Sequence, residues 1–191
     1  MNRRGDSVIV QPQTSPHLSE EAPNGCSAMK SVLLCLARFS SAAWVGAATL
    51  FVVVAVGQVT SRQFESEVTD RLAALRFPPY YVFGFTLVGT SLAGTLIGGS
   101  LLGCRGRQVT AAISLLVALG LMTADYIAIY QPLIRMITPP GSERPPEFER
   151  YHQFSEIINT VGLAFVLGAA FLLNWPAKRC RASKDLGELQ K

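Results

Sequence analysis

Charged side chains are scarce in this sequence. Only 16% of its 191 residues are Asp, Glu, Lys or Arg, and 49% are hydrophobic, whereas a soluble domain carries about a quarter charged residues. The deficit falls in four charge-free stretches, residues 39–61, 77–104, 108–124 and 157–177. Because a helix crosses a bilayer with about 20 apolar residues, we predict four membrane spans, the third carrying one acid near its end, and expect no second, soluble domain.

Histidine and cysteine are also scarce, which argues against metal and haem sites. The two histidines are His17 in the N-terminal tail and His152 in the expected membrane domain, so two axial haem ligands cannot come from the membrane part of one chain. The four cysteines are scattered, with no pair at metal-ligand spacing. We therefore predict no cofactor and no metal, and we expect free thiols in a reducing compartment.

Hydrolase motifs are absent as well. Neither G-x-S-x-G nor H-E-x-x-H occurs in the chain. Ser155 and Glu156 are adjacent in sequence, so their side chains diverge by about 100° around a helix. We predict that the protein is not an enzyme, and a membrane-embedded enzyme is the weakest of the alternatives.

The four charge-free stretches predict an all-α fold, an integral membrane four-helix bundle. We place the spans at about 32–59, 80–102, 109–133 and 151–175, within a transmembrane domain of residues 31–176. Residues 1–30, rich in Pro, Ser, Gln and Glu, are typical of a disordered cytoplasmic tail, and residues 177–191 of a basic cytoplasmic tail. In the first outer loop Phe64, Val68, Leu72 and Leu75 recur at helical spacing. This pattern predicts a short amphipathic helix on the outer surface, ended by two prolines.

Positive charge is distributed unevenly about these spans. If both termini are cytoplasmic, most of the 17 Lys and Arg residues lie on the inner side, including the cluster in residues 178–184. The positive-inside rule favours this orientation. We predict a plasma-membrane protein whose partner is the lipid bilayer, with no nucleic acid. The long side chain of Arg38, inside the first span, is expected to extend to the inner headgroups.

Small residues follow the second span at intervals of four, in two neighbouring rows. Such rows let the backbones of two helices approach closely. The rows are Ser91, Thr95, Gly99 and Gly103, and beside them Thr90, Gly94 and Gly98. We predict helix contacts at the glycines Gly94, Gly98, Gly99 and Gly103, and expect Ala118, on a span without such a row, to tolerate a larger side chain.

Polar residues gather where the last span begins. His152, Ser155, Glu156 and Asn159 share one helical face by their spacing, and the third span places Asp125 at a similar depth in the outer half. Intramembrane polar groups need partners or water. We prefer the interpretation that these five residues form a buried hydrogen-bonded network that locks the third span to the fourth.

An outward-facing polar cavity is the alternative interpretation of the same residues. Such a cavity would bind or transport a small cation, a proton or another solute. Four spans in one chain leave little room for a pore, so transport would require a homo-oligomer. We expect Glu156 and Asp125 to share a proton or a cationic partner, and Arg62 and Arg135 are the nearest candidate cations.

Four short motifs lie along the expected spans. They are Arg76-Phe77-Pro78-Pro79-Tyr80-Tyr81, Ala43-Trp44, Gln131-Pro132 and Phe148-x-Arg150-Tyr151-His152-x2-Ser155-x3-Asn159. Together they resemble the transmembrane protein 205-like family, a four-span membrane family whose molecular function is not established. The resemblance covers about residues 36–175 and implies a four-span fold without an assigned activity. Leu36 stands where the family often has a histidine, which argues against a multi-histidine metal site in this chain.

Overall fold

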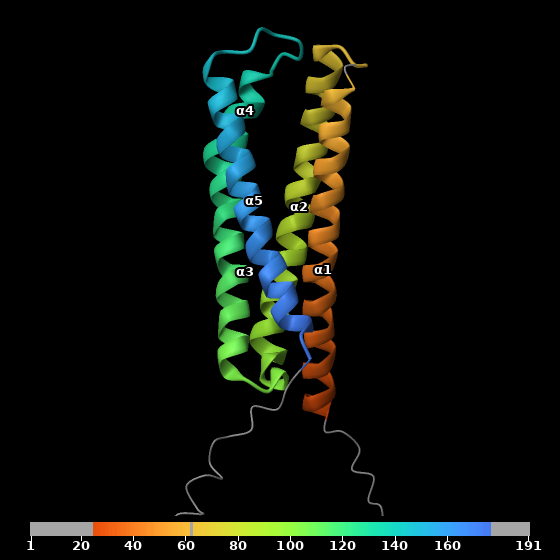
Figure 1. Ribbon diagram of the computed structural model, residues 1–191, viewed down its shortest axis with the longest axis vertical. Helices are drawn as coiled ribbons and strands as arrows, with labels where there is room; N and C mark the ends of the chain where they lie inside the picture. Colours follow the sequence, from red (N-terminus) through yellow and green to blue (C-terminus); the bar gives the residue numbers. More distant parts are fainter. Residues whose placement is uncertain (1–24, 62, 177–191) are drawn as a thin grey trace, which may run out of the picture.

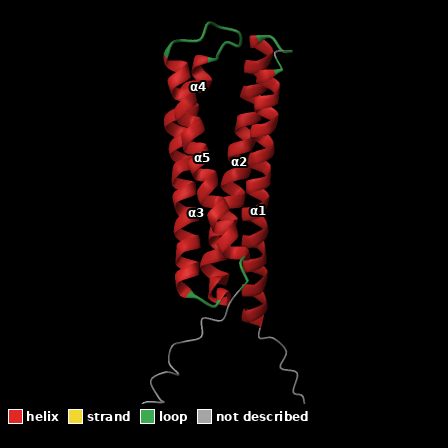
Figure 2. Ribbon diagram, viewed as in Figure 1, coloured by secondary structure: helices red, strands yellow, loops and turns green. Residues whose placement is uncertain are grey.

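The computed structural model describes residues 25–61 and 63–176, and over these ranges the chain is helical, without a strand (Figures 1 and 2). Four helical stretches are long and apolar enough to cross a membrane: Gly25–Thr60, Ser66–Leu102, Arg105–Met136 and Glu147–Asn174. The all-α four-helix bundle predicted from hydropathy is therefore confirmed.

The four stretches are built from seven helical elements. The first is α1 (Gly25–Thr60), and the second is α2 (Ser66–Gly98) with a 3₁₀ turn, η1 (Gly99–Leu102). The third begins as α3 (Arg105–Asp125), widens into the π-helical η2 (Tyr126–Tyr130) and resumes as α4 (Gln131–Met136). The fourth is α5 (Glu147–Asn174).

The bundle is formed by two closely packed helix pairs. Helix α1 packs most extensively against α2, and α3 against α5. Both pairs run along the long axis, and the described chain begins and ends at the same end of the bundle (Figure 1). Ala37, Val88, Leu115 and Val166 are fully buried between the helices. Large apolar side chains also cover the outside, as in helices that face lipid.

Helix α1 begins earlier than predicted. Its 36 residues span about 54 Å at 1.5 Å per residue, well over the 30 Å of a bilayer core. The expected disordered tail of residues 1–30 is wrong for residues 25–30, which are helical. Residues 1–24 and the basic tail, residues 177–191, lie outside the described residues.

The predicted amphipathic outer-loop helix is not a separate element. Its residues form the first turns of α2, which continues through Pro78 and Pro79. A proline removes one helical hydrogen bond and crowds the preceding turn, yet neighbouring helices can hold such a helix together in a membrane. Here α1 supplies contacts close to both prolines. Phe51 packs against Phe77, with ring centroids 5.4 Å apart, and against Tyr80, at 4.4 Å.

Pro132 lies inside the third helical stretch, where a proline usually bends or ends a helix. The helix widens into the π-helical η2 immediately before it and resumes with Pro132 in the first turn of α4. A π-helical turn shifts the hydrogen-bond register by one residue, so the helix can accommodate a residue that has no N–H. Asp125 is the last α-helical residue before this change.

The second outer loop is fastened to α2 by one buried carboxylate. Asp70 is only 3% exposed, and its Oδ1 accepts a hydrogen bond from Arg144 Nη2 at 2.9 Å. Its Oδ2 accepts one from the backbone N–H of Gly141 at 3.1 Å. This glycine has a φ of 82°, a value that L-residues rarely adopt. The contact ties the connection between α4 and α5 to the start of α2.

The structure places Gly94 and Gly98 against the α1 backbone, Gly99 against a side chain of α3, and Gly103 in the turn before α3. A Cβ atom at Gly94 would lie 2.4 Å from the Leu33 carbonyl oxygen, and one at Gly98 would lie 2.6 Å from the Lys30 carbonyl oxygen. At these points α2 therefore lies directly on the α1 backbone. The atoms nearest to a Cβ at Gly99 belong to the Gln108 side chain, which can move, and a Cβ at Gly103 meets nothing within 4 Å. Gly103 instead ends the helix with a φ of 77°.

Two further expectations are wrong. Ala118 is fully buried in the bundle core, so it is not a position that tolerates a larger side chain. Cys104 is disulfide-bonded, whereas Cys26 and Cys35 are free thiols as expected.

Candidate functional site

Asp125 lies at the centre of the polar site. Its side chain is fully buried at the end of α3. The hydroxyl of Tyr81, on α2, donates a hydrogen bond to Asp125 Oδ2 at 2.5 Å. The side-chain amide of Asn159, on α5, donates to the same oxygen at 2.7 Å. One carboxylate oxygen thus joins three of the four membrane-spanning stretches.

Asn159 connects this carboxylate to the rest of α5. Its Nδ2 also lies 2.9 Å from the Ser155 carbonyl oxygen and 3.2 Å from Ser155 Oγ, one turn earlier. Its own Oδ1 accepts a longer hydrogen bond, 3.4 Å, from the Tyr80 hydroxyl. The amide is therefore oriented by contacts on both sides, with its donor end towards Asp125.

The second oxygen of Asp125 has no hydrogen-bond partner among the described residues. Oδ1 is buried and makes no hydrogen bond to any described residue. The aromatic rings nearby belong to Tyr126 and Tyr130, each with its centroid 5.0 Å from that of Tyr81. Within residues 25–61 and 63–176, no positively charged side chain bonds Asp125, and no group of three His, Cys, Asp or Glu side chains could hold a metal ion.

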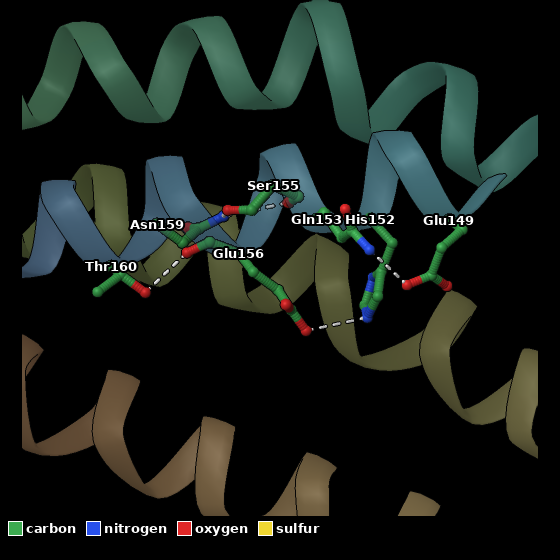
Figure 3. A network of polar contacts seen from close by, with 7 residues as sticks. All are labelled: Glu149, His152, Gln153, Ser155, Glu156, Asn159 and Thr160. Carbon is green, nitrogen blue, oxygen red and sulfur yellow. Dashed lines mark hydrogen bonds and ion pairs between the residues drawn. The ribbon is translucent and has the colours of Figure 1, made fainter. Parts of the chain in front are cut away.

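His152 and Glu156 form a second, separate polar pair. His152 Nε2 lies 3.2 Å from Glu156 Oε1, and the two side chains are 48% and 65% exposed. Figure 3 shows this pair reaching away from α5, while Ser155 and Asn159 lie close to the helix. The single polar face predicted from spacing is thus divided into a half-buried part, Ser155 and Asn159, and an exposed part, His152 and Glu156.

The expected sharing of a proton or cation between Glu156 and Asp125 is therefore wrong. Glu156 precedes Asn159 by three residues, which places it about 60° away around the helix. It also lies 18 residues from Asn174, about 27 Å along α5, so a 30 Å bilayer core that began at Asn174 would end close to Glu156. Water can solvate Glu156 there, and its partner is His152.

A small cavity adjoins the buried network. Its volume is about 10 Å³, room for about one water molecule. The lining residues come from all four membrane-spanning stretches: Trp44, Tyr80, Met122, Ile158, Asn159, Gly162 and Leu163. This cavity is too small for an organic ligand. A wider hollow of about 330 Å³ lies at the start of α5 beside η2 and is lined mostly by exposed side chains.

Tyr81 belongs to the site although the sequence analysis did not single it out. Its side chain is 2% exposed and bonds Asp125. Helical periodicity could have identified Tyr81 if the helix had been predicted to continue through Pro78 and Pro79. Tyr81, Val88, Ser91 and Thr95 then fall on the buried face of one helix.

The C-terminal end of α5 carries a second unexpected arrangement. Arg38, which was expected to extend to the headgroups, donates a hydrogen bond from its Nε to the Leu173 carbonyl oxygen at 2.8 Å, close to the last turn of α5. Arg107, from α3, donates to the carbonyl oxygens of Leu172 and Trp175, at 2.5 Å each, and to that of Leu173 at 3.3 Å. The last carbonyl groups of α5, which have no helical partner, are thus capped by two arginines.

No protein-family model, curated protein or solved structure matches this chain.

Proposed function

We propose that the chain is a multi-pass integral membrane protein of the transmembrane protein 205-like type, in which Asp125, Asn159 and Tyr81 fasten the spans to one another. The observation that carries this proposal is the shared oxygen, Asp125 Oδ2, which accepts hydrogen bonds from α2 and α5 at once. Lipid offers no hydrogen-bond partner. A fully buried carboxylate that accepts two hydrogen bonds therefore keeps them only while α2, α3 and α5 hold their relative positions.

This arrangement does not favour catalysis. A hydrolase needs a base in hydrogen-bond reach of its nucleophile. The Ser155 hydroxyl instead contacts the amide of Asn159, and the only described histidine, His152, pairs with Glu156. We therefore propose no enzymatic activity for this site.

A small-cation, proton or solute site at Asp125 is the second candidate function. The observation that favours it is the buried Oδ1, which lacks a partner among the described residues. The π-helical η2 begins at the next residue, and single π-helical turns are frequent at functional sites. Because the adjoining cavity holds about one water molecule, passage across the membrane would require a homo-oligomer.

Melting temperature measured against cation identity separates these two candidates. The full-length protein would be purified in detergent and melted in sodium, potassium, lithium and choline salts at equal ionic strength, beside Asp125→Asn. If Asp125 only fastens helices, neither protein responds to the cation, since ionic strength is fixed. A cation that binds the folded state at 100 times its dissociation constant would stabilise the wild type by about 2.7 kcal/mol.

The variant Asp125→Asn provides the control. Its carboxamide oxygen still accepts hydrogen bonds from Tyr81 and Asn159, so it should remain folded, but it has no charge to hold a cation. A cation-specific rise in the wild type that this variant lacks would overturn the purely structural role. The same response in both proteins would place any cation elsewhere.

We also propose that both termini are cytoplasmic, in the plasma membrane. The even number of spans and the position of both described ends at one end of the bundle (Figure 1) support a shared side for the two tails. Two single-cysteine proteins, one retaining Cys26 and one carrying Glu143→Cys, would be treated with a membrane-impermeant maleimide on intact cells. We expect labelling at position 143 only, and labelling at Cys26 only after permeabilisation.

Labelling of Cys26 on intact cells, without labelling at position 143, would reverse this orientation. Both reporter positions are exposed in the structure, so accessibility to the reagent depends on the side of the membrane.

A further inference from the structure

Two arginines from different helices converge on one carbonyl group at the inner end of α5. The Leu173 oxygen accepts hydrogen bonds from Arg38 Nε at 2.8 Å and from Arg107 Nη2 at 3.3 Å. Since both guanidinium groups contact the same atom, their positive charges are close neighbours. The end of a helix offers only about half an elementary negative charge, so α5 does not balance two cations.

No carboxylate in the described part of the chain supplies the missing charge. All of its acidic residues lie in the outer loops, in the outer turns of α2 and α5, or at the outer end of α3. They are Glu65, Glu67, Asp70, Asp125, Glu143, Glu147, Glu149 and Glu156. The inner end instead adds Lys30 and Arg105 to the arginine pair. Across residues 25–61 and 63–176, this end of the bundle therefore carries positive charge alone.

The arginine pair is reachable and has hydrogen-bond capacity left. Arg38 and Arg107 are both half-buried. A guanidinium has five N–H donors, and the bonds to the α5 carbonyls use one nitrogen of Arg38 and two of Arg107. Helix α5 ends above the inner ends of α1 and α3 (Figure 1), so the pair lies where a headgroup can approach between helices.

Apolar side chains surround this position. Phe39, next to Arg38, is 68% exposed, and Phe171 and Trp175 pack on each other with ring centroids 4.7 Å apart while both remain exposed. Tryptophan at the end of a span is typical of the headgroup region. A lipid at this position would meet cationic donors at its headgroup and exposed apolar side chains along its acyl chains.

We propose that Arg38 and Arg107 bind the phosphate group of an anionic phospholipid in the leaflet at this end of the bundle. The planar, paired donors of arginine match phosphate oxygens, and basic pockets between membrane helices bind lipid headgroups. The inference is independent of the Asp125 network and of the family resemblance. It also gives the two unbalanced charges a partner that every biological membrane supplies.

The test measures lipid retention by the full-length protein. Native mass spectrometry after incubation with equal amounts of phosphatidylglycerol and phosphatidylcholine would count the lipids bound to wild type, Arg38→Gln/Arg107→Gln and Arg105→Gln. Arg105 is an exposed cation at the same end, so its variant controls for general loss of charge. We expect wild type and Arg105→Gln to retain phosphatidylglycerol preferentially, and the double variant to bind it about tenfold more weakly or worse, as charged hydrogen bonds are lost.

A second double variant and a competition measurement test the proposal further. Arg38→Lys/Arg107→Lys keeps both charges and removes the planar donors, so it should lose part of the preference even if the glutamine variant does not fold. Inorganic phosphate should not displace the lipid. Equal retention of the two lipids by wild type, unchanged retention in a folded double variant, or complete displacement by millimolar phosphate would each overturn the proposal.

Discussion

Gly94→Leu should unfold the bundle at a much lower temperature than the wild type. Even a single methyl group at this position would lie 2.4 Å from the Leu33 carbonyl oxygen and 2.9 Å from Ala37 Cβ. The nearest obstacle is backbone, which cannot rotate away as a side chain can. One turn earlier, Ser91 donates a hydrogen bond to the Ala37 carbonyl oxygen at 3.0 Å, and separation of the helices would break it. We expect a loss of about 3 kcal/mol or more, at the upper end for overpacked sites.

Gly89→Leu is the matched control for this change. It lies on the same helix, and a Cβ there meets nothing within 4 Å, so the larger side chain extends outward and should cost less than about 0.5 kcal/mol. Gly99→Ala should fall between the two, because the atoms that it meets belong to the Gln108 side chain. Melting of the purified proteins in one detergent measures all three. Equal losses at positions 94 and 89 would show that α2 does not lie on the α1 backbone.

Asp125→Leu should be nearly as damaging, for a different reason. Leucine fills a similar volume but accepts no hydrogen bond, so the Tyr81 hydroxyl and the Asn159 amide lose their shared acceptor inside the bundle. A buried donor left without a partner costs about 1–3 kcal/mol, which applies in full to the Tyr81 hydroxyl, whereas the half-buried Asn159 amide keeps the Ser155 oxygens. We therefore expect a loss of about 3 kcal/mol in unfolding free energy, measured by thermal or denaturant unfolding in detergent.

Asp125→Asn and Glu156→Leu are the control variants for Asp125→Leu. The asparagine keeps an acceptor oxygen and should retain most of the stability, whereas Glu156 is 65% exposed and bonds only His152 through its side chain. Exposed pairs of this kind contribute about 0–1 kcal/mol, so Glu156→Leu should change little. A large loss at Glu156 together with a small loss at Asp125 would show that the exposed pair, and not the buried network, stabilises the bundle.

Much of this architecture could be predicted from the residues alone. Length and hydropathy are sufficient for four spans, because in lipid every backbone polar group must bond within its own helix or barrel. The spacing of Gly94 and Gly98 also predicted a close helix contact, since close backbone approach in membranes requires small residues. Asp125 could be recognised as a site residue because a carboxylate inside an apolar run needs a specific partner.

The identity of the partners was decided only by the tertiary structure. Spacing placed Glu156 and Asn159 near one face, but the rotation of α5 against α3 determines which of them meets Asp125. Tyr81 joined the site because α1 holds α2 helical through Pro78 and Pro79, and no local pattern in α2 encodes that contact. In the same way, Arg38 caps α5 because of the axial offset between α1 and α5. A helix has a periodicity that its own residues reveal, whereas its rotation and offset relative to a neighbour depend on packing across residues far apart in the chain.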